Sequence, residues 1–336
     1  MNDITIVMPT FNKEKYIVQA LDSVFAQKTS YSFEIIIPDD HSTDETLSII
    51  QDYQNKYPAK ITLLTSDINQ KLYKNVIRAY AQLKTPYFCV LDPDDYWTDP
   101  LHLQKALDFL ASHPDYTIYC SDILKLYPNG TQTPCQFASH PTTSTFMDFL
   151  NNKSTLAFTQ STVFRNIVFS KGLPKFMQQL PSKTAEKSFR GDTFRNLIHL
   201  HEGKAYYVPE IQSVYRITEE GIWAGSIQME RELLNANIFK DMWLYFDKQY
   251  PELLVKSYLA YGKLHDILTE SLSQIHDRNK LLAIIRDLVW LSQIYGSEKK
   301  ALIRSMYSML KLKDKFRLFC YLKLKYKLQS KGLFLY

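Results

Sequence analysis

Residues 87–95 read YFCVLDPDD, an apolar run that ends in three carboxylates within four positions. Aromatic and β-branched residues ahead of turn formers predict a short buried strand. The first 120 residues repeat this plan, because stretches with helical period separate further apolar runs at residues 4–8, 33–38, 61–65 and 116–119. Such alternation is typical of the α/β class, with a mostly parallel sheet and flanking helices. Ligands of these sheets bind beyond the carboxyl ends of the strands.

The composition limits the possible classes of protein. Of 336 residues, 45% are hydrophobic, and 40 Lys and Arg against 35 Asp and Glu give a net charge of +5. Disordered and fibrous chains are therefore excluded. Among nine glycines, the first is Gly130. Residues 1–129 consequently contain neither a GxGxxG dinucleotide motif nor a P-loop, so any phosphate bound there must be neutralised by other groups.

The alternating pattern weakens after residue 120. Residues 126–147 carry several turn formers and no regular period, which predicts a long flap-like loop. A helix is expected at 192–200 and a strand at 205–208, and a period of 3.6 dominates from residue 228 onward. These changes divide the chain into residues 1–120, residues 121–226 and a helical C-terminal region at 227–336.

Positive charge is concentrated in the last part of the sequence. Residues 299–336 contain eleven Lys or Arg and one acid, so this segment carries +10 and the rest of the chain −5. In 299–331 the basic residues are interleaved with Leu, Phe, Tyr and Met, a composition typical of an amphipathic helix on an anionic membrane surface. The alternative is a helix packed on the body with a solvated basic face. Nucleic acid is not an expected partner, because no recognition motif accompanies the charge.

The cysteines and the N-terminal sequence bear on the compartment. Cys89, Cys120, Cys135 and Cys320 show no CxxC spacing, and no apolar export signal precedes them. The sequence has no run of about 20 apolar residues, the length that spans a bilayer. We therefore expect a cytoplasmic protein in a reducing compartment, with any membrane contact peripheral and at the inner face.

Two acidic clusters follow predicted strands. Asp39 and Asp40 follow the second strand, and Asp92, Asp94 and Asp95 follow the fourth. Capping of the next helix is an alternative role for the first pair. Three crowded carboxylates repel one another unless a cation lies between them, and oxygen ligands of this kind suit Mg²⁺ or Mn²⁺. Because such an ion keeps coordination positions for phosphate, the expected partner is a diphosphate.

Four sequence segments, in a fixed order along the chain, match the motifs of a known protein family. They are IVMPTFN at 6–12, ALDSVFAQ at 20–27, EIIIPDDHSTDET at 34–46 and LDPDD at 91–95. Together they resemble the family 2 glycosyltransferases of GT-A fold, of the type that builds bacterial cell-surface polysaccharides. The resemblance implies a Rossmann-like fold and an inverting transfer of a hexose or N-acetylhexosamine from a nucleoside-diphosphate sugar, preferably a UDP-sugar. The acceptor would be a hydroxyl of a glycan or lipid-linked molecule. Residues 1–120 would bind the donor, and residues 121–226 would bind the acceptor and supply the catalytic base.

The resemblance also implies a donor site at the strand ends. The Pro-Thr-Phe turn would wall the nucleobase pocket, the double Asp would accept a hydrogen bond from the base, and a Lys-Asn pair would face base or phosphate. The last aspartates match the family's DXD element, whose first members contact ribose, with Asp95 and then Asp94 binding Mg²⁺ or Mn²⁺. The residues implied in donor binding are Pro9, Thr10, Phe11, Asp39, Asp40, Lys74, Asn75, Asp92, Asp94 and Arg216.

Three further positions bear on the chemistry. Asp192 matches the acid that opens a helix in the family, which implies the general base, although capping of that helix is the alternative. Arg216, in a Tyr-Arg pair, would bind phosphate or hold a catalytic carboxylate, or else it forms a surface ion pair. His41 stands where the family usually has Gly after the double Asp, so this turn must form without the residue that adopts it most easily.

Two other functions remain open from the sequence. A sugar-1-phosphate nucleotidyltransferase also combines a metal with an open α/β sheet, but it normally needs a Gly-rich N-terminal loop, which residues 1–129 lack. A nucleotide-sugar-binding protein without turnover would keep the pocket, and the intact set of Asp92, Asp94 and Asp95 disfavours that alternative.

Overall fold

The computed structural model describes residues 2–178, 191–218, 228–257 and 259–260. The basic segment at 299–336 lies outside the described residues, as do most of the helices predicted beyond residue 228. The chain divides into two units, and these are residues 1–179 with 191–224, and residues 180–190 with 225–336. All the predicted strand ends belong to the first unit.

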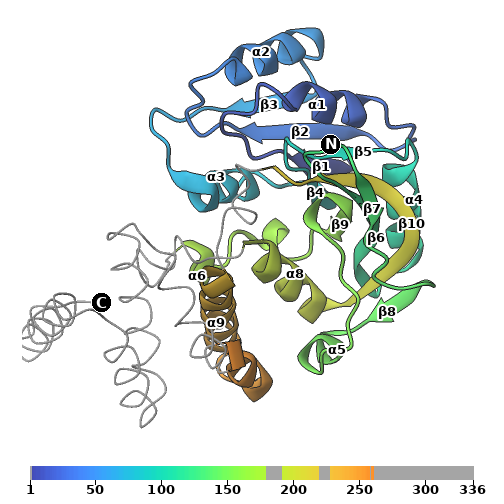
Figure 1. Ribbon diagram of the computed structural model, residues 1–336, viewed down its shortest axis with the longest axis vertical. Helices are drawn as coiled ribbons and strands as arrows, with labels where there is room; N and C mark the ends of the chain where they lie inside the picture. The colour runs from blue at the N-terminus through green and yellow to red at the C-terminus, as the bar shows by residue number, and fades with distance from the viewer. Residues whose placement is uncertain (1, 179–190, 219–227, 258, 261–336) are drawn as a thin grey trace, which may run out of the picture. The chain divides into compact units, whose positions relative to one another are not determined.

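Within the described residues, ten strands form one mixed sheet in the first unit (Figure 1). The strand order is β3-β2-β1-β4-β9-β6-β10-β5, with β7 beside β6 and β8 beside β10. Strands β3, β2, β1 and β4 are parallel, as are β6 and β10, whereas β9 runs antiparallel between β4 and β6. The strands are β1 (Ile4–Val7), β2 (Phe33–Pro38), β3 (Ile61–Leu64), β4 (Tyr87–Val90), β5 (Tyr96–Trp97), β6 (Tyr116–Leu126), β7 (Gln132–Pro134), β8 (Thr142–Ser144), β9 (Thr162–Arg165) and β10 (Lys204–Arg216).

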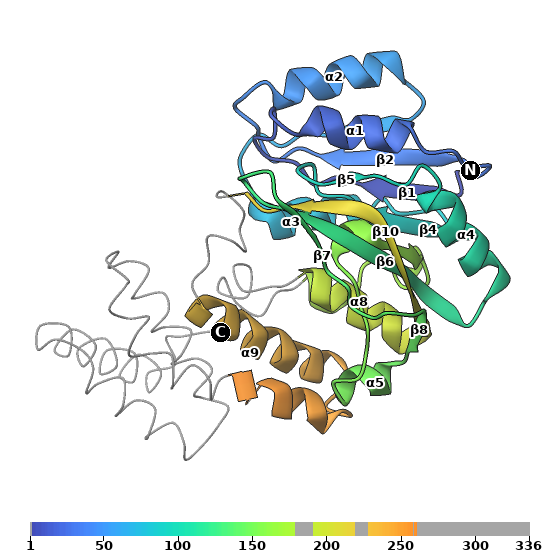
Figure 2. The ribbon, with the colours of Figure 1, turned by 45° about the vertical axis from the view of Figure 1, so that its right-hand side comes forward.

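Helices cover both faces of this sheet, which confirms the predicted α/β class with flanking helices. α1 and α2 lie on one face and α3 and α8 on the opposite face, as Figures 1 and 2 show. α1 buries Ile17, Ala20, Leu21 and Val24, which share one side at helical spacing. The described helices of this unit are α1 (Ile17–Phe25), α2 (Thr46–Lys56), α3 (Lys71–Tyr80), α4 (His102–Ser112), α5 (Phe146–Leu150), α6 (Lys175–Gln178) and α8 (Gly191–Glu202), with 3₁₀ turns η1 (Thr159–Ser161) and η2 (Phe169–Lys171).

Four antiparallel strands, β5, β7, β8 and β9, have no counterpart in the sequence prediction, and they make the sheet mixed rather than mostly parallel. Each is two to four residues long, too short to show a period. β7 and the end of β6 form a hairpin, and Gly130 in its turn has φ +82°. The stretch 126–147 thus holds a hairpin, strand β8 and the start of α5 rather than one long loop.

Strands β6 and β10 extend well beyond the predicted ranges 116–119 and 205–208. Polar residues interrupt their apolar pattern, and some of these residues are buried with hydrogen-bond partners. The carboxylate of Asp122, for example, accepts the backbone N–H groups of Ile123 and Gln136, each at 2.9 Å. Because β10 continues to Arg216, its end reaches the loop that follows β4.

The described part of the second unit contains α9 (Gln228–Tyr245), which agrees with the helical period predicted from residue 228. The hydroxyl of Ser257 donates to the carbonyl of Ala236 at 2.6 Å and ties the following segment to that helix. Lys240 and Asp241 are both buried on α9, with 3.9 Å between the ammonium nitrogen and a carboxylate oxygen.

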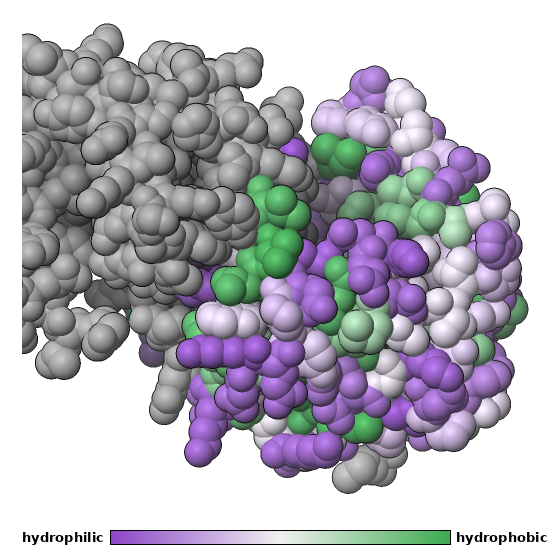
Figure 3. Space-filling model, turned by 90° about the horizontal axis from the view of Figure 1, so that it is seen from below, coloured by the Kyte–Doolittle hydropathy of each residue, from purple (hydrophilic) through white to green (hydrophobic). Residues whose placement is uncertain are grey.

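The surface and the helices also bear on membrane contact. On the face shown in Figure 3, the coloured residues are mostly hydrophilic, with small hydrophobic patches between them. In the part of the chain that the structure describes, no helix is both long and apolar enough to cross a membrane.

Candidate functional site

A tight loop between β4 and β5, residues 92–95, carries the three predicted DXD aspartates, and we call it the acidic loop. The backbone N–H of Asp95 donates to the carbonyl of Asp92 at 2.9 Å, which closes the loop. Asp95 is buried, and its carboxylate accepts the backbone N–H of Arg216 at 2.8 Å. The guanidinium of Arg216 donates to the carbonyl of Asp94 at 3.0 Å. The end of β10 therefore fixes the acidic loop through two hydrogen bonds.

Negative charge is crowded within this loop. Burial, followed by the charge of Asp94, raises the pKa of Asp92 to about 7. The pKa of Asp95 is raised well above its usual range, first by burial and then by Asp92 and Asp94. Both shifts mean that the ionised carboxylates are poorly compensated by the protein alone. A positive group that entered between them would be strongly favoured.

One ammonium group already lies against the loop. Lys13 Nζ is 2.7 Å from Asp94 Oδ2, and both side chains are about four-fifths buried. The backbone N–H of Lys13 donates to the hydroxyl of Thr46 at 2.6 Å, which fixes the turn after β1. The sequence analysis did not identify Lys13, although this residue directly follows the first family segment, which ends at residue 12. A cationic residue so close to that turn was the available signal.

Arg216 also reaches the helix behind the loop. Its Nη2 donates to Gln19 Oε1 at 2.6 Å, and its guanidinium lies 5.0 Å from the ring centre of Tyr16 and 5.6 Å from that of Tyr96. Arg216 is thus engaged in bracing the acidic loop. Its predicted contact with phosphate or with a catalytic carboxylate stays a prediction.

The turn after β1 lies beside the turn after β2, as the resemblance implied. Thr10 pairs with Asp39 in an isolated parallel bridge, and the backbone N–H of Asp40 donates to the carbonyl of Thr10 at 2.9 Å. Pro9 begins the turn, and Phe11 leaves 41% of its side chain exposed. An exposed aromatic ring at a strand end is available for stacking, so the assignment of Pro9, Thr10 and Phe11 to a nucleobase wall stays a prediction that this geometry allows.

The two predicted base-binding aspartates have different surroundings. Asp39 accepts the backbone N–H and the hydroxyl of Ser42 at 3.0 and 2.5 Å, which is capping-type chemistry within the turn. His41 has φ +66°, so the turn does adopt the left-handed conformation that usually takes Gly. Asp40 is buried, and its two oxygens accept the backbone N–H groups of Gln70 and Lys71 at 2.7 and 2.8 Å. Asp40 therefore holds the segment before α3 over the end of β2.

The predicted Lys-Asn pair divides between two roles on α3. Asn75 is buried, and its side-chain amide donates to the carbonyl of Pro38 at 2.6 Å. Its carbonyl oxygen accepts from Arg78, which also donates to the carbonyl of Asp39 at 3.0 Å. Asn75 thus secures the carboxyl end of β2, whereas Lys74 is exposed on the neighbouring position. Of the pair, Lys74 has the accessibility that a phosphate contact needs.

Asp192 lies in the first turn of α8 and is exposed. A shared neighbour relates it to the acidic loop: burial, and after it the charges of Asp95, Asp92, Asp94 and Asp192, raise the pKa of Tyr215 to about 12. Five acidic or phenolic groups from β10, α8 and the acidic loop are thus within electrostatic range of one another. The structure therefore gathers the predicted base and the predicted DXD element in one region.

A buried guanidinium that the sequence prediction missed lies one turn after Asp192. Arg195 is 2% exposed, and it donates to the hydroxyls of Tyr80 and Thr159 at 3.1 and 3.2 Å. Its charge lowers the pKa of Asp92 and so partly offsets the effects of burial and of Asp94. The spacing of three residues from Asp192 on a predicted helix was the available signal, since such positions share a face.

The donor chemistry of the acidic loop fits a hard divalent cation. Carboxylate oxygens suit Mg²⁺ and Mn²⁺, and crowding raises the pKa of Asp92 and of Asp95 where a cation would lower both. Among the described residues, no three potential ligand side chains are already grouped as a metal site. Asp95 and Asp94 would therefore hold the ion together with oxygens from outside the protein, such as those of a diphosphate.

The chain is similar to known proteins in both sequence and fold. A sequence profile described as Glycosyl transferase family 2 matches residues 5–173. An uncharacterised protein of Mycobacterium tuberculosis is 30% identical over 229 residues, which are 68% of this chain and 63% of that protein. The poly(ribitol-phosphate) β-N-acetylglucosaminyltransferase TarS of Staphylococcus aureus is 26% identical over 249 residues, 71% of this chain and 42% of TarS. The chain thus matches less than two thirds of the length of either relative.

Two solved structures show the fold. That of S. aureus TarS 1–349 in complex with UDP-GlcNAc has a TM-score of 0.56 at 16% identity, over 89% of this chain and 83% of that one. That of the mannosyltransferase PcManGT from Pyrobaculum calidifontis, in complex with GDP-Man and Mn²⁺, has a TM-score of 0.51 at 15% identity, over 92% and 87%. The expected GT-A fold is confirmed. Because the family profile covers half of the chain, from β1 through the acidic loop to β9, this protein belongs to glycosyl transferase family 2.

Proposed function

We propose that this glycosyltransferase uses a divalent metal and inverts the anomeric centre, moving a hexose or N-acetylhexosamine from a UDP-sugar to a hydroxyl of a glycan or lipid-linked acceptor. The observation that carries the proposal is the acidic loop at the end of β4, braced by Arg216, with Asp192 in the same electrostatic environment. The expected process is synthesis of cell-surface polysaccharide, a proposal supported by the named activity of TarS on poly(ribitol phosphate).

The nucleobase would bind between the turns after β1 and β2. Phe11 offers an exposed ring for stacking, and each oxygen of Asp40 keeps a second lone pair after accepting one backbone N–H. Such an acceptor serves N3–H of uracil or thymine and also N–H groups of guanine. The UDP-GlcNAc complex of TarS supports uracil as the first choice, and the GDP-Man complex of PcManGT keeps guanine as the alternative.

The reaction is a single displacement at the anomeric carbon. The bond to the acceptor oxygen forms on one face of the sugar as the bond to the diphosphate oxygen breaks on the other, which inverts the configuration. A divalent cation held by Asp95 and Asp94 would stabilise the negative charge that develops on the leaving diphosphate. Arg216 contributes by holding the acidic loop through its backbone N–H and its guanidinium.

Asp192 would accept the proton of the attacking hydroxyl. It is exposed at the first turn of α8, so its carboxylate is accessible from solvent. A positioned base of this kind typically contributes about 10² to 10⁴-fold to the rate. Arg195, buried one turn further along α8, places positive charge close to the carboxylate of Asp92.

The acceptor would lie on the β6 and β10 side of the acidic loop. Phe158 is 37% exposed there, and its ring centre is 5.2 Å from that of Tyr215. Tyr215 is the phenol whose pKa is raised by burial and by the carboxylates of the acidic loop and of Asp192. Lys125 Nζ lies 5.9 Å from the Phe158 ring centre. An exposed aromatic ring beside a catalytic region is a suitable platform for a sugar ring. We expect loss of Phe158 to raise the KM of the acceptor more than that of the donor.

The location of the protein also remains a proposal. The basic, apolar composition of residues 299–331 supports attachment to the anionic inner face of the cell membrane, where a lipid-linked acceptor would be available. Truncation after Glu298 should then move the protein from anionic vesicles to the supernatant in a sedimentation assay. Unchanged sedimentation would contradict this attachment.

A nucleotide screen followed by a hydrolysis assay tests the proposed activity. Thermal shifts would be measured with UDP, GDP and dTDP, each with and without Mn²⁺, and UDP with Mn²⁺ should stabilise most. Slow hydrolysis of UDP-GlcNAc, with water as acceptor, would then separate an enzyme from a protein that only binds nucleotide sugars. Stabilisation without any turnover of UDP-, GDP- or dTDP-linked sugars would contradict the catalytic assignment.

A further inference from the structure

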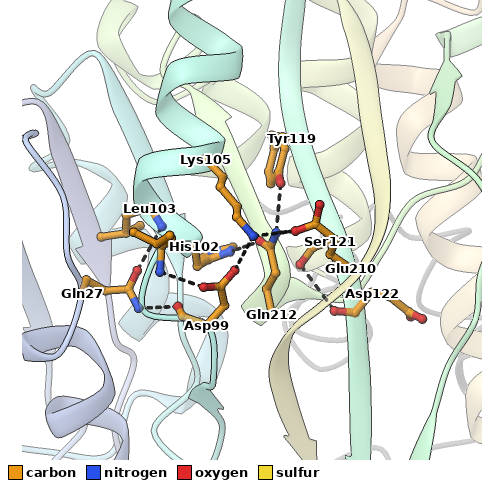
Figure 4. Close-up of polar contacts among 11 residues, drawn as sticks. Gln27, Asp99, His102, Leu103, Lys105, Tyr119, Ser121, Asp122, Glu210 and Gln212 are labelled. Atoms are coloured by element: carbon orange, nitrogen blue, oxygen red, sulfur yellow. Dashed lines mark hydrogen bonds and ion pairs between the residues drawn. The ribbon is translucent and has the colours of Figure 1, made fainter.

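Gln212 is a fully buried glutamine on β10 whose side chain is hydrogen-bonded at both ends (Figure 4). Its Oε1 lies 2.7 Å from His102 Nδ1, and its Nε2 donates to the hydroxyl of Tyr119 at 3.1 Å. Burial lowers the pKa of His102 to about 4, so the ring is neutral. Because an amide oxygen can only accept, the proton of that ring lies on Nδ1 and is donated to Gln212. Gln212 therefore links β10 to both α4 and β6 through fixed partners.

The backbone of Gln212 bonds to the segment that follows the acidic loop. Its carbonyl accepts the backbone N–H groups of Thr98 and Asp99 at 3.0 and 3.3 Å. The next residues of β10, Ser213 and Val214, pair with Trp97 and Tyr96 of β5. Since β5 begins directly after Asp95, the position of Gln212 determines where the acidic loop ends.

β10 is irregular just before this glutamine and at it. Its pairing with β6 shifts register between Val208 and Ile211 and again between Ile211 and Ser213. Such irregularities re-aim a strand, and a slip of one residue would turn each following side chain to the opposite face. The backbone N–H of Arg216 meets the carboxylate of Asp95 only in the observed register. Something must fix that register, and Gln212 is a buried polar residue at the second of these two shifts.

The partners of Gln212 are themselves held in place, as Figure 4 shows. The side-chain amide of Gln27 donates to the carbonyl of Asp99 at 2.9 Å and accepts the backbone N–H of Leu103 at 3.0 Å. Lys105 bonds Asp99 at 2.9 Å and Glu210 at 2.6 Å. The start of α4 is therefore a rigid support against which β10 can be registered.

We propose that Gln212 is a positioning residue of the donor site. It fixes the register of β10, and through Arg216 and β5 it holds the carboxylates of Asp94 and Asp95 in the arrangement that binds a metal and a diphosphate. The use of that arrangement rests on the proposed function, whereas the positioning itself does not. In a positioning role, Gln212 contacts neither the nucleotide nor the metal.

The test compares the wild-type chain with Gln212→Leu by two measurements. Hydrogen exchange in the absence of ligand should become at least tenfold faster at the amides of Thr98, Asp99 and Arg216, because their common anchor is lost. The affinity for UDP at saturating Mn²⁺ should fall at least tenfold, while the residual affinity for UDP without Mn²⁺ should change less than threefold. Unchanged exchange at these three amides would overturn the proposal.

Asn166→Leu is the matched control. Asn166 is a buried amide side chain that donates to the carbonyl of Thr85 at 2.9 Å, before the start of β4 and thus at the opposite end of that strand from the acidic loop. Its loss should lower the melting temperature while leaving exchange at Arg216 and the affinity for Mn²⁺ with UDP within twofold of wild type. A tenfold loss of this affinity in Asn166→Leu as well would mean that general destabilisation explains the effect, and would overturn the proposal.

Tyr119→Phe keeps the test decisive if Gln212→Leu does not fold. This change removes one hydroxyl partner of Gln212 and preserves the ring, so folding should be retained. Exchange at Arg216 should rise about threefold, and unchanged exchange would overturn the proposal. If wild-type protein binds no nucleotide while exchange responds as expected, the positioning role stands and the proposed function alone is wrong.

Discussion

Lys13 and Asp94, 81 positions apart in the sequence, form an ion pair of 2.7 Å between the turn after β1 and the acidic loop after β4. The pair places an ammonium group against one of the two carboxylates that would bind a metal. A cation that approaches Asp94 must therefore compete with Lys13 for the same oxygen. This competition gives the ion pair a measurable consequence for metal binding.

Replacement of Lys13 by Met should strengthen binding of Mn²⁺ in the absence of nucleotide. Removing the competing ammonium leaves Asp94 more negative and more accessible. Partly exposed ion pairs are worth about 0.2 to 1 kcal/mol, so we expect about a 1.4- to fivefold lower Kd for Mn²⁺. Titration followed by electron paramagnetic resonance of free Mn²⁺ measures this directly.

The control for this prediction is Lys204→Met. Lys204 forms an ion pair of 2.9 Å with Asp115 at the start of β10, the opposite end of that strand from Arg216, so its loss should not change the affinity for Mn²⁺. Weaker Mn²⁺ binding in Lys13→Met than in wild type would show that the two cations do not compete for Asp94.

Asp95→Asn should abolish metal-dependent nucleotide binding while preserving the fold. The amide oxygen of Asn can still accept the backbone N–H of Arg216. The substitution also removes a buried carboxyl group whose pKa is raised by burial and by Asp92 and Asp94. The melting temperature without ligand should therefore be unchanged or higher, while the thermal shift caused by Mn²⁺ with UDP disappears. A wild-type shift in this variant would remove Asp95 from the metal site.

Asp192→Asn and Asp192→Ser should reduce sugar transfer by at least about 10²-fold, the usual contribution of a general base. Both side chains can still cap a helix, so the alternative role as an N-cap predicts near-normal rates. Binding of UDP with Mn²⁺ should be the same in both variants as in wild type. Transfer at more than a tenth of the wild-type rate would assign Asp192 to the helix alone.

Acid should destabilise the protein through buried His199. Burial among aromatic rings lowers the pKa of His199 to about 3, from an ordinary value near 6.5. The unfolded chain therefore takes up the proton first as pH falls, so the contribution of His199 to stability is complete above pH 6.5 and declines toward pH 3. Between pH 6.5 and 4 this amounts to roughly 3 kcal/mol.

His199→Phe tests this pH dependence. Urea unfolding should show that the variant loses less stability than wild type between pH 6.5 and 4, because the substituted ring cannot take up a proton. Identical pH dependence in the two proteins would mean that His199 does not contribute. Activity at neutral pH should be retained, since His199 packs beneath the sheet rather than at the strand ends.

Parts of the site that depend on strand ends could be predicted from the sequence. The apolar run before Asp92 and the one before Asp39 identify parallel strands, and the carboxyl ends of such strands meet at one edge. In the structure, Thr10 after β1 pairs with Asp39 after β2 at this edge. Local pattern is sufficient here because a short buried strand and the residues after it are contiguous in sequence.

Contacts between distant segments could not be predicted in this way. The bond from Arg216 to Asp95 joins residues 121 positions apart, and it depends on two register shifts in β10 that leave no trace in hydrophobic period. The two-residue strand β5 is too short to show alternation. Asn75 and Lys74 are neighbours in sequence, but the rotation of α3 buries one and exposes the other. Such features follow from tertiary packing rather than from local composition.

The central claim is that the acidic loop binds a nucleoside diphosphate through a divalent cation. Isothermal titration of wild-type protein with UDP, in the presence of Mn²⁺ and again after its removal by chelation, tests this claim most directly. We predict saturable binding of UDP that weakens at least tenfold when Mn²⁺ is removed, and that Asp95→Asn binds equally weakly with or without the metal. Binding of UDP that is equally tight with and without Mn²⁺ would contradict the account.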